Sequence, residues 1–299
     1  MKNFSQIKGI LFGCFAAICY GTNPLGALNL YPEGLSPESV LCYRFATAIV
    51  LLSLIQFFSQ RKNLKLAFAV KKRELLPLAI LGVLFAVCAV ALYAAFNFMD
   101  AGLASTLLFL YPLEVAVIMG LFFREKLTLK TAISIAISLL GIGLLYRGGE
   151  GGTALNATGL LLVFISSLTY AIYIVYLNKS NLVMSSVKLT FYVMIFCLLS
   201  LLLYSVTLGS GLPPVLKTAN AWGWALMLGL VPTVLSLVFM AKAGRLVGST
   251  PTAITGGLEP LTAVIIGVCV FGEVLTVRLA VGIVLILLAV TLLAVSKKN

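Results

Sequence analysis

Long apolar runs joined by short polar connections constrain this chain more than any other feature. A helix needs about 20 apolar residues to cross the hydrocarbon core of a membrane, and ten such runs are present. The runs are too continuous for the alternating pattern of roughly ten residues that marks a barrel strand. We therefore predict an all-α membrane protein with ten transmembrane helices. They cover approximately residues 8–29, 36–58, 75–98, 102–123, 128–146, 156–177, 187–208, 220–241, 249–271 and 275–295.

Composition excludes several classes of function. Of the 299 residues, 61% are hydrophobic and only 10% are charged, whereas a soluble domain is about 25% charged. A soluble enzyme, a DNA-binding domain and a disordered protein are therefore excluded. The chain has no histidine, and its six cysteines lie in apolar runs without a CxxC pair. We therefore expect no metal site. There is also no phosphate-binding Walker loop, and we expect no cofactor.

Basic residues are distributed unevenly between the two sides of the predicted membrane. Seventeen of the 21 Lys and Arg residues fall on one side and three on the other, while Arg44 lies inside a span. Because basic connections stay in the cytoplasm, we expect both termini there, in the cytoplasmic (inner) membrane of a bacterium. The net charge of +12 is then a topology signal and a contact for anionic lipid, rather than a nucleic-acid groove.

The two halves of the chain carry an internal repeat. The segment LYPLEVAVIMGLFFREKLT at 110–128 aligns without gaps to LEPLTAVIIGVCVFGEVLT at 258–276. A looser match relates residues 9–21 to residues 159–171. We therefore predict two copies of five spans, at residues 1–147 and 156–296. Because five is odd, the second copy enters the membrane from the opposite side, and inverted repeats of this kind are a transporter architecture with the substrate site between them.

These repeats resemble the drug/metabolite transporter superfamily, specifically its EamA-type members with ten helices. The resemblance rests on Pro112 followed by FFREKLT, Pro260 followed by VFGEVLT, and YRF at 43–45. It implies a central cavity lined by the first, third, fourth, sixth, eighth and ninth spans, and transport of amino acids or other small metabolites. The second copy departs from the first at Arg44, which aligns with Val193.

Three charged residues lie well inside predicted spans, namely Arg44, Glu114 and Glu259. Each costs about 2.5–3.5 kcal/mol at the centre of a helix that faces lipid. We therefore expect them to face a water-filled cavity or one another. Two interpretations stay open, a substrate or proton site and a structural ion pair. Arg44 lies about two turns into its helix, so snorkelling to the interface is a third interpretation for it.

Prolines and glycines are expected to interrupt four of the spans. Proline removes a backbone donor and clashes with the carbonyl four residues earlier, and membranes tolerate the exposed backbone only where it lines a cavity or is buried in protein. We predict hinges at these positions, with a packing kink as the alternative. The residues are Pro24, Pro112, Pro232, Gly256, Gly257 and Pro260.

Polar and aromatic residues near these positions complete the predicted substrate cavity. Asn23 and Asn97 offer hydrogen-bonding groups, and the carboxylate of Glu259 can bind the amino group of a substrate or carry a proton. Five tyrosines are candidates to stack on an organic substrate, with packing as the alternative: Tyr20, Tyr93, Tyr111, Tyr170 and Tyr173. Glu125 and Glu273 are instead predicted to cap the helix that follows each of them.

The sequence thus predicts a secondary transporter, and not an enzyme, that exports amino acids or related small metabolites by alternating access. Glu259 is our candidate for proton coupling, with Glu114 and Arg44 as its partners. Uptake of a vitamin-like or nucleotide-derived metabolite, and a channel, are the alternatives that the residues leave open. The expected partners are the lipid bilayer and a small-molecule substrate, without nucleic acid, and the expected assembly is a monomer or a homodimer.

Overall fold

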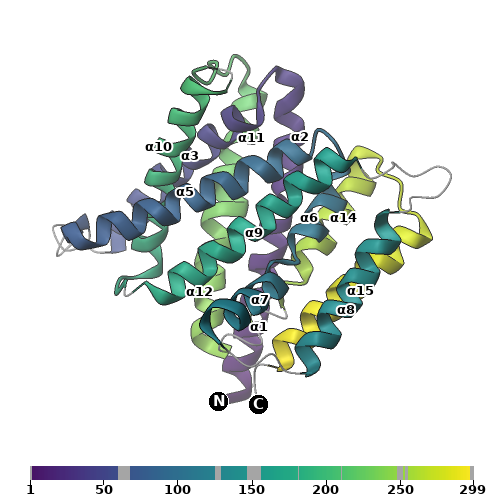
Figure 1. The fold of residues 1–299 in the computed structure, drawn as a ribbon. Helices are drawn as coiled ribbons and strands as arrows, with labels where there is room; N and C mark the ends of the chain where they lie inside the picture. The colour runs from purple at the N-terminus through teal and green to yellow at the C-terminus, as the bar shows by residue number, and fades with distance from the viewer. Residues whose placement is uncertain are drawn as a thin grey trace.

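The described part of the chain is a bundle of helices and the connections between them (Figure 1). The computed structural model describes residues 2–59, 68–124, 129–146, 156–180, 182–209, 211–247, 252 and 255–296. Glu125 lies outside the described residues, and so do the basic residues between positions 60 and 67. Helix α1 begins and helix α15 ends at the same end of the bundle (Figure 1).

The helices follow the order of the predicted spans. The first half holds α1 (Lys2–Gly21), α2 (Asn23–Leu30), η1 (Tyr31–Glu33), α3 (Pro37–Ser59), α5 (Lys72–Ala95), α6 (Ala101–Leu108), α7 (Tyr111–Phe123) and α8 (Leu129–Tyr146). The second half holds α9 (Ala157–Lys179), α10 (Ser186–Thr207), α11 (Ala219–Gly229), the π-helix η2 (Leu230–Leu235), α12 (Ser236–Val247), α14 (Leu258–Phe271) and α15 (Val277–Ser296).

Helix length and hydropathy confirm a multi-pass membrane protein. Within the described residues, seven helical stretches are long and apolar enough to cross a membrane. Three shorter apolar helices lie where the fifth, ninth and tenth spans are predicted, at Thr131–Ile142, Leu258–Phe271 and Val277–Leu292. The all-α membrane fold is therefore confirmed, whereas ten complete crossings stay a prediction.

Capping side chains explain where several helices begin, because the first N–H groups of a helix have no partner within it. The side chain of Asn156 accepts a hydrogen bond from the N–H of Thr158 at 2.9 Å at the start of α9. Thr218 accepts one from the N–H of Ala221 at 3.1 Å at the start of α11. Helix α14 is terminated by Gly272, the residue after its end, whose φ of 70° is the left-handed conformation that glycine adopts without strain.

Four spans are interrupted at the positions where the sequence places prolines and glycines. Helix α1 stops one residue before α2, near Pro24, and α6 is separated from α7 by residues 109–110, just before Pro112. The π-helix η2 contains Pro232. A turn at residues 256–257 precedes α14, close to Pro260. The lost backbone donor and the clash of the proline ring account for these breaks.

The interrupted spans pack against one another in the bundle. Helix α1 contacts α14 and η2, α2 contacts α11 and α14, and α6 contacts α14. The continuous helix α9 packs across α5, α6 and α7, and α8 pairs with α15 along one side of the bundle in Figure 1. Segments from both halves of the chain therefore meet where the backbone is irregular.

Candidate substrate site

Arg44 is the centre of a buried hydrogen-bond network. It lies in α3, its side chain is 3% exposed, and its Nε donates to Thr233 Oγ1 at 3.0 Å. Its Nη1 donates to the hydroxyl of Tyr93 at 3.0 Å, and that hydroxyl donates to Asn23 Oδ1 at 3.3 Å. The network joins α2, α3, α5 and η2, so Arg44 is held inside the bundle and does not snorkel.

The same network satisfies carbonyl groups that two prolines leave without a helical partner. Asn23 Nδ2 donates to the carbonyl oxygen of Tyr20, four residues before Pro24, at 2.8 Å. Thr233 Oγ1 donates to the carbonyl oxygen of Leu228, four residues before Pro232, at 2.9 Å. Asn23 and Thr233 thus satisfy the freed carbonyls of the interrupted first and eighth spans. Arg44 donates directly to Thr233 and is linked to Asn23 through the hydroxyl of Tyr93.

Aromatic rings enclose the guanidinium of Arg44. Its Cζ lies 5.3 Å from the ring centroid of Phe45, 5.7 Å from that of Tyr93 and 6.0 Å from that of Tyr20. These distances are in the range of cation–π attraction. Together with the two hydrogen bonds they explain how an arginine is retained among apolar helices.

Glu259 lies at the meeting point of the first and ninth spans. It is half-buried in the first turn of α14, immediately after the interruption. A Cβ added to Gly21, the last residue of α1, would lie 2.5 Å from the carbonyl oxygen of Glu259, so only glycine permits this approach. The carboxylate lies within electrostatic range of Arg44 and of the hydroxyl of Tyr20. It interacts in the same way with Cys88, Tyr111 and Tyr170.

Glu114 is a second carboxylate near these groups, and it is incompletely paired. Its Oε1 accepts a hydrogen bond from the hydroxyl of Ser167 in α9 at 2.8 Å. Its Oε2 is buried and has no hydrogen-bond partner among the residues that the structure describes. Because a buried polar atom without a partner costs about 1–3 kcal/mol, this oxygen needs a proton, a water molecule or a ligand.

Three tyrosines form a connected aromatic surface beside the carboxylates. The rings of Tyr170 and Tyr173, one turn apart on α9, are stacked with centroids 5.7 Å apart and planes 6° apart. Tyr111 of α7 meets Tyr170 edge-on with centroids 4.7 Å apart. All three are half-buried, so part of each side chain remains accessible.

Most of the predicted site residues come together, but one lies apart. Asn97 is exposed in the turn after α5. It belongs neither to the Arg44 network nor to the surroundings of Glu114 and Glu259. Two residues that the structure adds, Thr233 and Ser167, are absent from the sequence prediction. A hydroxyl next to a proline in an apolar run is the signal that points to Thr233, and the ISSLTY segment of α9 carries Ser167.

Glu273 caps a helix, as predicted, but not the helix that follows it. Its carboxylate accepts hydrogen bonds from the N–H groups of Ala101 at 2.7 Å and Gly102 at 3.2 Å, at the start of α6 in the other half of the chain. A Cβ at Gly267 would overlap this carboxylate. Burial raises the pKa of Glu273, and the charge of Asp100 adds to this, while the two N–H groups lower it in part. Glu273 reaches the start of α6 because α6 and α14 are neighbours in space.

Interrupted apolar helices that surround ionisable side chains are a property of membrane transporters, where broken helices form sites near the middle of the membrane. The fold and site therefore define a membrane transporter. The EamA-like transporter family matches this chain twice, at residues 7–147 and 157–295, and the chain belongs to that family. This agrees with the resemblance to the drug/metabolite transporter superfamily that the sequence shows.

Relatives of the chain are also transporters. A protein of Archaeoglobus fulgidus named "Uncharacterized transporter" is 30% identical over 222 residues, which cover 73% of this chain and 75% of that protein. The "Uncharacterized transporter YdfC" of Bacillus subtilis is 25% identical over 251 residues, 84% of this chain and 79% of that protein. A solved crystal structure aligns with a TM-score of 0.64 at 17% identity, over 97% of this chain and 99% of that chain, which shows a shared fold.

Proposed function

We propose that this chain is a secondary transporter that carries amino acids or related small amine-bearing metabolites out of the cytoplasm. Residues 1–147 and 156–296 act as two inverted five-helix repeats that rock against each other. The termini lie on the cytoplasmic side of a bacterial cytoplasmic membrane, in accord with the common end at which α1 begins and α15 ends.

One observation carries this proposal. Four interrupted spans, two from each half of the chain, pack together around Glu259 and the Arg44 network. An interruption lets the two parts of a span tilt separately, and residues at Pro24, Pro112, Pro232 and Gly256–Gly257 absorb that tilt. Alternating access requires movement of this kind around a fixed site.

The chemistry of the site favours an organic cation or zwitterion over a polyanion. Glu259 and Glu114 supply two carboxylates for an ammonium group, and Tyr111, Tyr170 and Tyr173 supply an aromatic surface for the organic part. A polyanionic substrate needs clustered cations, and Arg44 already donates to Thr233 and Tyr93. The proposed substrate therefore binds its amino group at one of these carboxylates and its organic part on the tyrosines.

Glu259 also couples transport to protons in this proposal. It lies between the repeats and next to a helix interruption, so movement of the repeats changes its access to water. The titratable or charged groups within its electrostatic range are Arg44, Tyr20, Cys88, Tyr111 and Tyr170. Exchange of a substrate ammonium for a proton on this carboxylate links the two fluxes.

The test is uptake of labelled amino acids and other small metabolites into proteoliposomes, with and without an imposed pH gradient. The proposal predicts saturable uptake of an amine-bearing class, counterflow, and a rate that follows the gradient. Saturable uptake that ignores the gradient overturns proton coupling. Uptake that does not saturate and shows no counterflow overturns the carrier mechanism in favour of a channel.

A further inference from the structure

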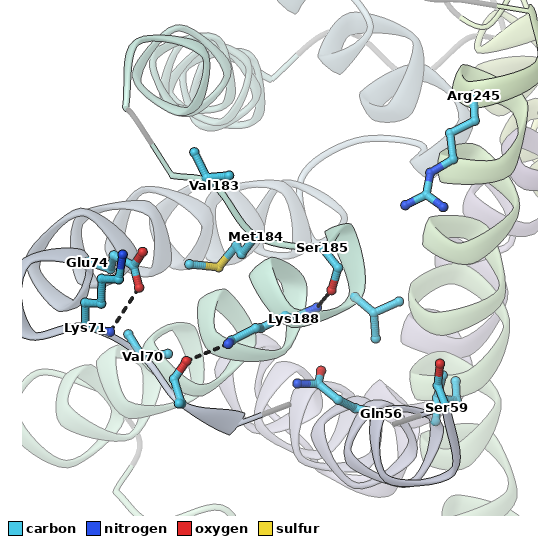
Figure 2. Close-up of a pocket in the computed structure, with 13 residues that line it drawn as sticks. Gln56, Ser59, Val70, Lys71, Glu74, Val183, Met184, Ser185, Lys188 and Arg245 are labelled. Carbon is cyan, nitrogen blue, oxygen red and sulfur yellow. Dashed lines mark hydrogen bonds between the residues drawn. The ribbon is translucent and has the colours of Figure 1, made fainter. Parts of the chain in front are cut away.

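A hollow lies at one end of the bundle, apart from Glu114 and Glu259. It is a cavity of about 630 Å³ between α3, α5, α10 and α12, lined by Ser59, Lys71, Lys188 and Arg245 among others (Figure 2). Ser59 is the last residue of α3, Lys71 directly precedes α5, and Ser185 caps α10. The cavity therefore lies where these spans end, at the level of lipid headgroups.

The bend in the eighth span explains why this space exists. The π-helix η2 packs against α3, but beyond Pro232 the chain continues as α12, which packs mainly along α1. The last turns of α12 thus diverge from α3 and α10. In Figure 2 Arg245 projects from α12 on one side of the cavity, and Lys188 and Gln56 lie on the other.

The charges around the cavity favour a singly charged anion. Three cations line it, Lys71, Lys188 and Arg245, against one carboxylate, Glu74. Glu74 Oε2 accepts a hydrogen bond from the N–H of Lys71 at 3.0 Å, and Lys188 Nζ donates to the carbonyl of Ala69 at 2.5 Å. Arg245 has no hydrogen bond or ion pair with any residue that the structure describes. Its exposed guanidinium is thus available to a phosphate oxygen.

An apolar groove continues from the cavity toward the middle of the membrane. This second hollow, of about 300 Å³, shares Ser59, Ser185, Val187 and Arg245 with the first. The rest of its lining is mainly apolar, from Leu52, Leu237, Val238 and Ala241, with Ser186, Thr190 and Lys242 as its polar members. Leu52 and Leu237 lie seven or eight residues from Ser59 and Arg245, about 10–12 Å along their helices. Such a groove gains nothing from a small water-soluble anion, whereas the acyl chain of a lipid can bury its apolar surface there.

We propose that this cavity binds the phosphodiester headgroup of an anionic phospholipid, with one acyl chain in the groove between α3, α10 and α12. Arg245 and Lys188 bind the phosphate, and the hydroxyl and amide groups of Ser59, Ser185 and Gln56 bind the glycerol part. Because the site lies between elements of both halves of the chain, bound lipid fills the wedge that the bend at Pro232 opens. This lipid site is independent of the transported substrate.

Native mass spectrometry of the purified full-length chain tests this inference without a transport assay. The probes are phosphatidylglycerol and phosphatidylcholine with identical acyl chains. We expect the chain to retain phosphatidylglycerol more tightly than phosphatidylcholine. Arg245→Gln then weakens phosphatidylglycerol binding about fivefold, the effect of one cation near an anionic lipid. Lys217→Gln, which removes an exposed cation at another hollow, is the matched control and leaves binding unchanged.

Two further arms separate a lipid from a free anion. Ala241→Phe fills the groove without a change of charge, and we expect it to weaken phosphatidylglycerol binding as well. Glycerol 3-phosphate, which carries the headgroup chemistry without acyl chains, is expected not to displace the lipid. Equal retention of both lipids, or equal effects of Arg245→Gln and Lys217→Gln, overturns the proposal. Displacement by glycerol 3-phosphate, with no effect of Ala241→Phe, shows a site for soluble anions instead.

Discussion

Two groups of polar side chains lie among the apolar helices, and they differ in how fully their atoms are paired. In the Arg44 network, Nε and Nη1 of Arg44, the hydroxyls of Tyr93 and Thr233, and both groups of the Asn23 amide all have partners. In the second set of side chains, Glu114 and Glu259, the Oε2 atom of Glu114 has no hydrogen-bond partner among the described residues. Arg44 is 3% exposed, whereas both carboxylates are half-buried.

This difference separates a structural role from a binding role. The paired groups of this network lower the energy of the conformation that they hold, and these groups are not available to a ligand. A buried oxygen without a partner raises the energy of the free protein, and that cost is recovered when a ligand or proton arrives. We infer that the Arg44 network holds the broken first and eighth spans together, while Glu114 and Glu259 receive the substrate. Substitutions in each group test this division.

The largest effect is expected for Glu259→Gln, which removes the charge proposed to bind the ammonium group. A hydrogen bond to a charged group is worth about 1.5–3 kcal/mol, so uptake at low substrate concentration falls roughly 10- to 150-fold. The dependence of uptake on a pH gradient disappears. Radiolabelled uptake into proteoliposomes measures both quantities. Glu33→Gln, which alters an exposed carboxylate, serves as control, and an unchanged rate and pH dependence in Glu259→Gln excludes the proposed role.

Arg44→Gln tests the paired group and is expected to act on stability. Two hydrogen bonds between helices are lost, each worth about 1 kcal/mol in membrane proteins, so the free energy of unfolding falls by about 2 kcal/mol. Thr233→Val removes one of these two and also the hydrogen bond from Thr233 Oγ1 to the carbonyl oxygen of Leu228, so it costs about as much. Thermal unfolding in detergent measures both losses against the wild type. Retained thermal stability together with lost substrate binding in Arg44→Gln moves Arg44 into the binding group.

The sequence predicts the positions of the interruptions but not the contacts that join the interrupted spans to one another. Pro24 and Pro232 reveal which carbonyls are freed, because the effect of proline is local. Asn23 and Thr233 bond those carbonyls within their own spans, so these contacts are local as well. Arg44, in contrast, reaches Thr233 directly and Asn23 through Tyr93, which depends on packing between helices far apart in the chain. For the same reason the acidic residue Glu273 is recognisable as a cap, while the helix that it caps is not.

Glu114→Gln tests the carboxylate that is only partly paired. The neutral amide removes a partly paired carboxylate, so the free energy of unfolding stays unchanged or rises by about 1 kcal/mol, while substrate binding weakens. Ser167→Ala is the opposite change, since it removes the partner of Oε1 and leaves both oxygens unpaired. We expect it to lower stability by about 1 kcal/mol. Thermal unfolding with and without substrate distinguishes the two, and a less stable Glu114→Gln contradicts the binding role.

The smallest effect is expected at Glu273, whose carboxylate is partly buried between the two halves of the chain. Its pKa in the folded protein lies above the ordinary value of 4.5, with burial as the main cause. The folded state therefore holds this proton more tightly than the unfolded state. The resulting stability is present below about pH 4.5 and is lost as the pH rises through the folded pKa.

Glu273→Gln removes this titration but keeps an oxygen for one N–H group of α6. Thermal unfolding measured between about pH 4 and about pH 7 should show a small loss of stability in the wild type that the variant lacks. Glu33→Gln should keep the slope of the wild type. At neutral pH the variant should then be at least as stable as the wild type. If Glu273→Gln is instead less stable at neutral pH, the hydrogen bonds from Ala101 and Gly102 stabilise the ionised carboxylate by more than its burial destabilises it.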